Sequence, residues 1–305
     1  MGLPEIFISF QTAAVSAITR SARGVLAVAV KDATAGGATE AAYKSLAEVP
    51  EDKFSPENYR LLKLAFLAAP TKVWVLRVGE DAEKTYQALE RLRFDWLAAP
   101  GLDDARVMSF IKTLRSGGRG VKAVVANATA PDCEGIVNLC VSGLTLEDGA
   151  MEAKDYAVRV AALLAALPLT RSATYVNLPE VVGCDALAEP DADVGKLIIV
   201  PGREGYRLGR AVNSLTTLTP DKAAPFQKIK IVEGIDLIRG DIAKAFESGY
   251  VGKVLNDYDN KLLLVTAINA YFRALEGDVL DKTADNACRV SLSGQRGWLE
   301  SHGTD

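Results

Sequence analysis

Hydrophobic and polar positions along the chain follow two different periods. Residues 24–30 and 73–76 are short, almost wholly apolar runs, which are typical of strands buried on both faces of a sheet. Between such runs, apolar residues recur three and four positions apart, which is the helical period. Strands that alternate with helices predict parallel pairing through helical crossovers. We therefore expect an α/β domain over residues 24–193.

The elements expected inside this domain follow one another in regular order. A capping Ser55, Pro56 at the first helical position and the acidic Glu57 predict a helix start. The remaining strands are expected at 95–98, 121–126 and 136–141, and the remaining helices at 82–92, 103–114 and 150–167.

The alternation of predicted strands and helices ends at an acidic, proline-containing loop at 185–193. Residues 197–200 read as a strand, 202–205 as a turn and 207–218 as a returning extended segment, which predicts an antiparallel hairpin. The alternation Lys-Ile-Lys-Ile at 228–231 predicts one further strand. We therefore expect a boundary near residues 190–196 and a C-terminal domain of antiparallel strands and helices over 194–305.

Two helices are expected near the end of this C-terminal domain. The first has Ile235, Ile238, Ile242 and Phe246 on one stripe and is expected to end at Gly249. The second, from about Asp257 to Leu275, has two apolar lines. They are Tyr258, Leu262, Val265 and Phe272 on one line, and Leu264, Ile268, Tyr271 and Leu275 on the other. A helix with two apolar lines is covered on two sides, so one side needs a further element or another chain.

The first 23 residues are expected to form an arm and a tether. In the opening stretch Ile6, Ile8 and Phe10 share one face of a strand, and Glu5, Phe7 and Ser9 share the other. This strand either lies at the edge of its own domain or pairs with the sheet of a neighbouring subunit. The small and polar residues 12–23 then act as the tether.

Composition and charge restrict the class of protein. The net charge of −4, from 39 acidic and 35 basic residues, gives no indication of a nucleic-acid partner. No apolar run approaches the roughly 18 residues of a membrane span, and Glu5 without a basic segment argues against a secretory signal. The four cysteines form no CxxC pair, so free thiols in a reducing compartment are expected. We expect a chain made in the cytoplasm.

Catalytic chemistry finds little support in the sequence. The one histidine, His302, lies three residues from the end, which argues against histidine-based catalysis or a histidine-ligated catalytic metal. No phosphate-binding loop is present, and Gly202, Gly205 and Gly209 have the wrong spacing for a dinucleotide fingerprint. We expect no catalytic residue, cofactor or metal. The alternative is a small-ligand binder or enzyme that uses the crevice at the carboxyl ends of the strands.

Several stretches resemble contractile phage tail sheath proteins, of the shorter type found in phages of Gram-positive bacteria and in R-type bacteriocins. None of them is a catalytic motif, and they come from both ends of the chain in the same order as in the family. They are residues Gly2–Phe10, Ala211–Leu218, Lys228–Ile238, Tyr250–Val254, Tyr258–Lys261 and Ala267–Phe272.

The resemblance implies a structural subunit that polymerises as a helical sleeve around an inner tube and shortens to drive the tube through a bacterial envelope. It implies a core domain made of the N-terminal arm and the C-terminal part, with the α/β domain facing outward. Its implied partners are copies of itself, the inner tail tube protein, and baseplate and tail terminator proteins. The particle is assembled in the bacterial host cytoplasm, as a virion tail or a released bacteriocin.

The family pattern also suggests which residues take part in assembly. The arm that adds a strand to a neighbour comprises Pro4, Glu5, Ile6, Phe7, Ile8 and Phe10. The tether includes Thr19, Arg20 and Arg23. The candidate contacts with the tube or a neighbour are Lys244, Lys253, Lys261 and Tyr271.

The end of the chain departs from the family pattern. Family members carry a further C-terminal segment that ends in a strand, and this chain stops at Ser301–Asp305, where that segment is expected to begin. We therefore expect spontaneous polymerisation of the 305-residue form to be impaired.

Overall fold

The computed structural model describes residues 17–185 and 194–303. Within these residues the chain forms two compact units. The sheet unit comprises residues Ala22–Ile238, and the helical unit comprises residues up to Ser21 together with those from Arg239 onward. The predicted arm residues Pro4, Glu5, Ile6, Phe7, Ile8 and Phe10 lie outside the described residues.

The sheet unit is built on a nine-stranded mixed sheet with the strand order β2-β3-β1-β4-β5-β6-β11-β12-β9. Strands β3, β1, β4, β5, β6 and β11 run parallel, whereas β2, β12 and β9 pair antiparallel at the two ends. The strands are β1 Val25–Val30, β2 Glu40–Tyr43, β3 Lys72–Arg77, β4 Trp96–Ala98, β5 Lys122–Ala126, β6 Ile136–Cys140, β9 Asn177–Leu178, β11 Lys196–Gly202 and β12 Gly205–Leu208.

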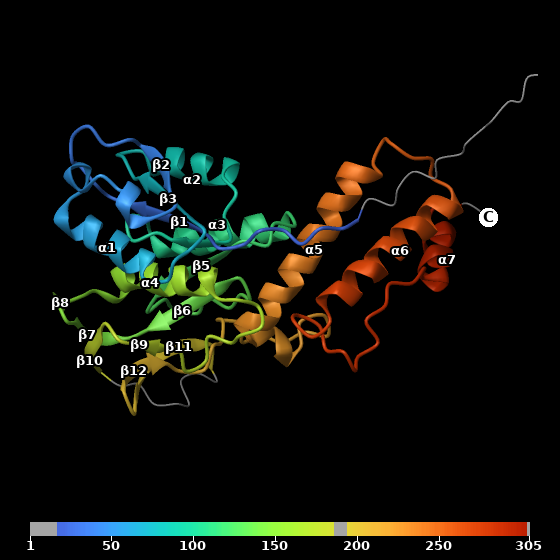
Figure 1. Ribbon diagram of the computed structural model, residues 1–305. Coiled ribbons are helices and arrows are strands. Elements are labelled where there is room, and N and C mark those ends of the chain that lie inside the picture. Colours follow the sequence, from blue (N-terminus) through green and yellow to red (C-terminus); the bar gives the residue numbers. More distant parts are fainter. Residues whose placement is uncertain (1–16, 186–193, 304–305) are drawn as a thin grey trace, which may run out of the picture. The chain divides into compact units, whose positions relative to one another are not determined.

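Helices cover both faces of this sheet, and each face has its own hydrophobic core (Figure 1). Helices α1 (Pro56–Phe66) and α4 (Ala153–Ala166) pack on one face, where Leu62, Tyr156 and Leu139 are buried. Helices α2 (Ala82–Arg91) and α3 (Asp104–Ser116) pack on the other, against Leu97 and other buried side chains. Burial on both faces explains why β1 is apolar almost without interruption. The prediction of an α/β domain is confirmed, within a mixed α and β chain.

A smaller sheet extends this unit beside α4. It consists of β10 (Val181–Asp185), β7 (Ser142–Leu146) and β8 (Gly149–Ala150), paired antiparallel in that order. Strand β7 follows β6 after a single residue, Val141, so the chain passes directly from the large sheet into the small one.

Helix starts agree with the capping signals in the sequence. The Ser55 hydroxyl accepts a hydrogen bond from the Asn58 N–H at 3.2 Å, with Pro56 in the first turn. The Asp257 carboxylate caps α6 (Tyr258–Leu275) by accepting from the Asn260 N–H at 2.8 Å. Side chains at these positions satisfy N–H groups that the helix itself leaves unpaired.

The predicted strand at 228–231 is wrong. Helix α5 runs from Ile229 to Gly249 and therefore includes most of that segment. Ile229, Val232 and Leu237 are buried, whereas Ile231 is exposed, which is a helical and not an alternating pattern. Four residues are too few to separate the two periods. The predicted stripe is also misplaced, because Ile235 and Phe246 are 36% and 45% exposed.

The compact sheet unit continues beyond the boundary expected near residues 190–196. Strand β11 pairs in parallel with β6, from Lys196 opposite Asn138 to Ile198 opposite Cys140, so it is part of the large sheet. Strand β12 then turns back on β11, which confirms the predicted hairpin. The first ten residues of α5 also belong to this unit, which ends at Ile238.

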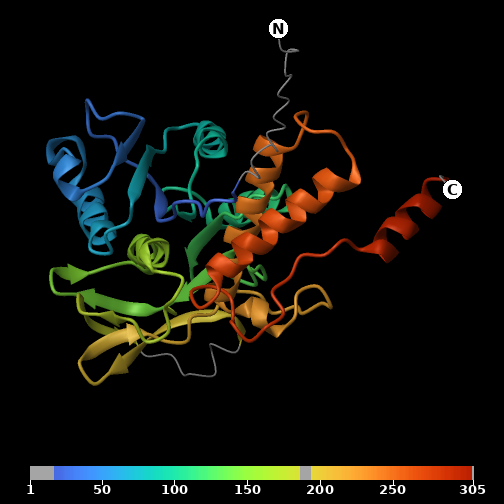
Figure 2. The same cartoon turned by 45° about the vertical axis from the view of Figure 1, so that its right-hand side comes forward.

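The helical unit contains the second half of α5, all of α6 and α7 (Leu292–Ser301). Buried residues of α6 all lie in its second half, and they are Ala267, Ile268, Tyr271 and Leu275. Figure 2 shows α7 apart from α6, with an extended connection between them. No residue of α7 is buried. Within the described residues, no helix is long and apolar enough to cross a membrane.

Candidate functional site

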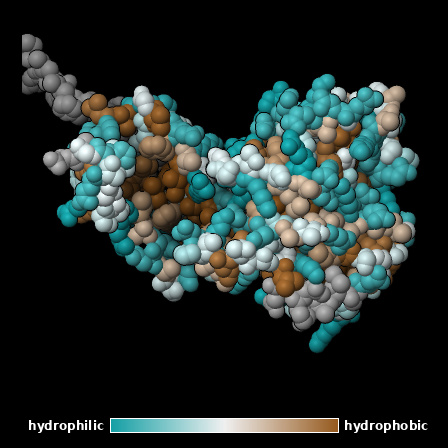
Figure 3. All heavy atoms as spheres, turned by 180° about the vertical axis from the view of Figure 1, so that it is seen from behind, coloured by the Kyte–Doolittle hydropathy of each residue, from teal (hydrophilic) through white to brown (hydrophobic). Residues whose placement is uncertain are grey.

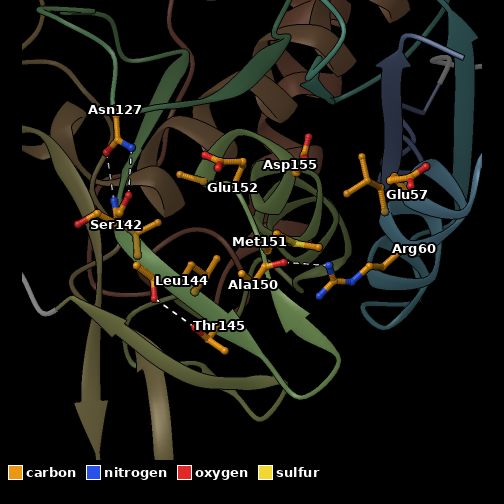
Figure 4. A pocket seen from close by; sticks show the side chains of 14 residues that line it. Glu57, Arg60, Asn127, Ser142, Leu144, Thr145, Ala150, Met151, Glu152 and Asp155 are labelled. Atoms are coloured by element: carbon orange, nitrogen blue, oxygen red, sulfur yellow. Dashed lines mark hydrogen bonds between the residues drawn. The ribbon is translucent and has the colours of Figure 1, made fainter.

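A cavity of about 560 Å³ opens at the carboxyl ends of β5 and β6 (Figure 4). Its walls come from four places in the fold: helix α1, the loop after β5, strand β7 and the start of α4. This is the position at which α/β sheets bind ligands. The polar side chains on its walls are Glu57, Arg60, Asn127, Ser142, Thr145, Glu152 and Asp155.

Acidic groups dominate the chemistry of this cavity. Burial raises the pKa of Asp155, and the neighbouring Glu152 carboxylate raises it further. Arg60 is already bound, because its Nε donates to Asp148 Oδ2 at 2.7 Å and its Nη1 to the Ala150 carbonyl at 3.0 Å. That bond lowers the pKa of Asp148. The cavity therefore presents an excess of negative charge.

The cavity does not combine a nucleophile with a base. Its walls hold no histidine, cysteine or lysine among the described residues, and the Ser142 hydroxyl donates to Asp185 Oδ2 at 2.9 Å. The side chain of Asn127 forms two hydrogen bonds with Val141: its Oδ1 accepts from the Val141 N–H at 3.2 Å, and its Nδ2 donates to the Val141 carbonyl at 3.0 Å. Asn127 itself has a positive φ of 48°. No group of three or more candidate metal ligands occurs in the described ranges. The acidic and polar walls of the cavity are suited to a small polar or cationic molecule.

The tether residues contact α5 near its start and at its middle, and also a residue that follows α6. In the helical unit, the Ser21 N–H donates to both Asp241 carboxylate oxygens at 3.2 Å, and Arg20 forms an ion pair with Asp278 at 3.6 Å. In the sheet unit, Arg23 forms an ion pair with Glu233. Thr19 is exposed. Of the three predicted tether residues, the two arginines are therefore bound within the chain.

Tyr271, one of the candidate contacts, is buried in the helical unit. It is 3% exposed, and its hydroxyl donates to Asp241 Oδ2 at 2.5 Å. Burial raises the tyrosine pKa, and the bond to Asp241 raises it further. Tyr271 and Ser21 thus hold one buried carboxylate from two sides. We call Ser21, Asp241 and Tyr271 the tether anchor.

The three candidate lysines lie on the surface of the helical unit. Lys244 on α5, Lys253 in the connection between α5 and α6, and Lys261 on α6 are all exposed. The Lys253 ammonium donates to the Ser248 carbonyl. Their contact with a tube or a neighbour stays a prediction.

A buried ion network within the sheet unit joins the start of α5 to strand β5, and no pattern in the sequence indicated it. Lys122, on β5, is 3% exposed and lies 3.0 Å from both Asp236 Oδ2 and Glu233 Oε1. Arg115 binds Asp236 at 2.8 Å and Glu134 at 3.2 Å. Burial disfavours the Asp236 carboxylate, but Lys122 and Arg115 outweigh it and lower its pKa. Burial lowers the pKa of Lys122. Glu233 and Asp236 lie more than 100 positions from Lys122 and Arg115, so no local pattern could reveal these contacts.

Comparison with known proteins finds sheath proteins both as a sequence signature and as a full-length relative. A sequence signature described as the phage tail sheath C-terminal domain matches residues 221–293. The tail sheath protein of Clostridium phage phiCD119 is 33% identical over 321 aligned positions, covering 98% of this chain and 87% of that relative.

Two solved structures show the same fold. The sheath tail protein of Desulfitobacterium hafniense has a TM-score of 0.77 at 16% identity, over 92% of this chain and 91% of that one. The helical sheath of the anti-feeding prophage, in its contracted state, has a TM-score of 0.70 at 14% identity, over 93% and 87%. At these identities the likeness concerns the fold.

Proposed function

This chain belongs to the phage tail sheath protein family, and on that premise we propose that it polymerises as a helical sleeve around an inner tail tube. It is a structural subunit of a contractile-tail sheath. In this proposal the sleeve shortens and drives the tube through a bacterial envelope. Its partners are further copies of the chain, the inner tube protein, and baseplate and tail terminator proteins. Assembly takes place in the bacterial host cytoplasm, and the product is a virion tail or a released bacteriocin particle.

The observation that carries this proposal is the half-covered helix α6. Its line Leu264, Ile268, Tyr271 and Leu275 has three buried members, whereas on the other line Tyr258 and Leu262 are 63% and 39% exposed. Exposed apolar groups of this kind mark surfaces for other protein chains. A subunit of a polymer needs such surfaces, and an isolated protein does not.

The N-terminal arm supplies the second element of the proposal. Pro4, Glu5, Ile6, Phe7, Ile8 and Phe10 add a strand to the sheet of a neighbouring subunit in the assembled sleeve. Thr19, Arg20 and Arg23 belong to the tether that links this arm to its own subunit. Main-chain hydrogen bonds between subunits survive a rigid-body shift of the domains, which keeps the sleeve connected while it shortens.

We infer no catalysis for this chain, and no cofactor. Energy for shortening is stored in the extended assembly, so the sheath subunit needs no nucleotide site. The relative from Clostridium phage phiCD119 is named a tail sheath protein, and the matching signature is that of a sheath domain, which supports a non-enzymatic role.

A pelleting experiment tests polymerisation directly. The chain produced together with its inner tube protein should sediment at high centrifugal force as a stoichiometric assembly of both proteins. The chain alone serves as the reference. This chain remaining in the supernatant while the tube protein polymerises and sediments would argue against the proposal.

The acidic cavity favours a second candidate, binding of a small ligand. A thermal-shift screen with nucleotides, divalent metals and small amines measures this directly, because a ligand that binds only the folded state raises the Tm. A reproducible rise that is lost in an Asp155→Asn variant would establish a ligand site. Unchanged Tm values with all of these compounds would argue against a ligand site, and the sheath function would be the one remaining proposal.

A further inference from the structure

The helical unit carries an apolar surface that the described residues leave open. Side chains with at least about a third of their area exposed follow one another along the end of α5, the connection and the start of α6. We call these residues, Phe246, Val251, Val254, Leu255, Tyr258 and Leu262, the α5–α6 apolar surface. Figure 3 shows apolar side chains lining a hollow in this unit. A contiguous patch of this kind marks an interaction site, whereas scattered apolar residues do not.

Two aromatic rings are stacked at the end of α5, where this surface begins. The rings of Phe246 and Tyr250 are stacked, with their centroids 6.2 Å apart. None of the first nine residues of α6 is buried, although Leu262, Leu263, Leu264 and Val265 follow one another there. A helix end this rich in leucine and valine is stabilised in water only when another element covers it.

The N-terminal tether begins on the same unit. Ser21 is bound to Asp241 of α5, and Arg20 is paired with Asp278, just after α6. Ile18 is 9% exposed, so the tether is also packed by an apolar contact. These three contacts fix the point from which the preceding residues start. Any segment before Ala17 therefore leaves from the helices that carry the open surface.

The 16 residues before Ala17 are long enough to extend along either helix. An extended chain gains about 3.3 Å per residue, so residue 10, seven positions before Ala17, reaches up to about 23 Å and residue 4, thirteen positions before it, up to about 43 Å. At about 1.5 Å per residue, α5 and α6, with 21 and 18 residues, are about 32 and 27 Å long. The reach of residues 4–10 is therefore comparable to the length of either helix.

The chemistry of this segment complements the surface. Residues 1–16 contain a single charged side chain, Glu5. In an extended conformation Ile6, Ile8 and Phe10 project to one side. Such a segment can bury one apolar edge and keep its other edge in water. We propose that residues 4–10 dock on the α5–α6 apolar surface of the same subunit when that subunit is free.

A tethered segment has an advantage over a second copy of the chain. A short flexible linker gives the tethered segment an effective concentration of the order of millimolar at the surface. Free subunits at about micromolar concentration are about a thousandfold more dilute, so they occupy the same surface less often. Docking within the subunit makes the arm unavailable to neighbours until assembly displaces it. This consequence for assembly rests on the proposed sheath function, but the docking itself does not.

Hydrogen–deuterium exchange on the monomeric full chain tests the docking. Ile8→Asp places a charge on the docking edge, and Ser9→Asp places the same charge on the opposite edge as a matched control. We expect exchange of the amides in residues 258–266 to be at least about tenfold faster in Ile8→Asp than in the wild type. The Ser9→Asp control should match the wild type. Both positions lie outside the described fold, so helicity should be unchanged.

Two results would overturn the docking proposal. The first is identical exchange at residues 258–266 in the wild type and both variants. The second is protection that disappears on dilution in parallel with a fall from dimer to monomer mass, since this would identify a second copy as the occupant. Because the measurement uses monomers, a failed docking leaves the sheath proposal intact, and failed polymerisation leaves the docking intact.

Discussion

Asp32 shows how one side chain fixes a local arrangement. Its carboxylate follows β1 and accepts hydrogen bonds from the Thr34 and Ser55 N–H groups, at 2.9 and 3.0 Å, and from the Asn58 amide at 2.8 Å. Burial opposes its ionisation, but these donors outweigh burial and lower the pKa from 3.8 to about 2. One ionised group therefore ties the end of a strand to the start of α1.

The lowered pKa of Asp32 predicts a loss of stability in acid. The carboxylate stabilises the fold above its unfolded pKa, near 4, and this contribution is lost as the pH falls toward about 2. The free energy of unfolding, measured by urea titration between pH 5 and pH 2, should fall more steeply in the wild type than in Asp32→Asn. Parallel pH profiles would contradict this role.

The tether anchor predicts a second effect at a single residue. Tyr271→Phe removes the hydroxyl that donates to Asp241, a carboxylate that is 3% exposed. Leaving this buried acceptor with fewer donors should cost about 1–3 kcal/mol in the free energy of unfolding. Tyr258→Phe, at a tyrosine that is 63% exposed, is the control and should change it by less than about 0.5 kcal/mol. Equal effects of the two variants would show that the anchor adds no stability.

Helix α5 is divided between the two units. Its first ten residues belong to the sheet unit and carry Glu233 and Asp236 into the buried ion network. The remainder belongs to the helical unit and carries Asp241. Buried ion pairs add little net stability, but they are costly to break, because the partner is left as an uncompensated charge. The network therefore fixes the position of the first ten residues of α5 within the sheet unit.

Two glycines test the packing of α5 with opposite expected signs. Gly240 lies inside the helix with no atom within 4 Å of an added Cβ, so Gly240→Ala should stabilise the chain by up to about 1 kcal/mol. An added Cβ at Gly120 would lie 2.8 Å from the Asp236 Cβ. Gly120→Ala should therefore destabilise the chain by about 1–3 kcal/mol. Urea unfolding of both variants measures the difference, and a stabilising Gly120→Ala would contradict the close contact.

At the level of elements, the sequence predicted most of the sheet unit and failed at its last helix. Apolar runs such as Val25–Val30 are decisive, because both faces of the central strands are buried. The prediction of a strand at Lys228–Ile231 was wrong because four residues fit the period of a strand and that of a helix equally well. The helix is favoured in the folded chain, where Ile229 and Val232 are buried in the sheet unit. Arg115, Lys122 and Asp236 were missed because each reads alone as a solvated charge and their contact depends on the folded chain.

For the whole molecule, the division into units also exceeded what local patterns could predict. The acidic loop before Lys196 reads as a boundary, yet β11 continues the large sheet beside β6. Long-range pairing of this kind leaves no trace in composition. Helix α6 forms where its two apolar lines predicted it and buries one of them, whereas cover for the other line stays a prediction that calls for a partner.

The surface lysines of the helical unit give a prediction for the assembled particle. Reversing Lys244, Lys253 and Lys261 to Glu should weaken co-sedimentation with the inner tube about tenfold or more at low salt, and by less at high salt, because salt screens exposed charges. Lys31, Lys84 and Lys112, which are exposed on the sheet unit, provide a triple Glu control with the same change in net charge. Equal binding of the two triple variants would remove these lysines from the tube contact.

Negative-stain electron microscopy of the chain produced together with its inner tube protein tests the central claim most directly. A sheath subunit should form striated sleeves around the tube, wider than the tube alone, and contracted sleeves should be shorter and hollow. Bare tubes beside dispersed monomers, with this chain stably folded in the same sample, would contradict the account.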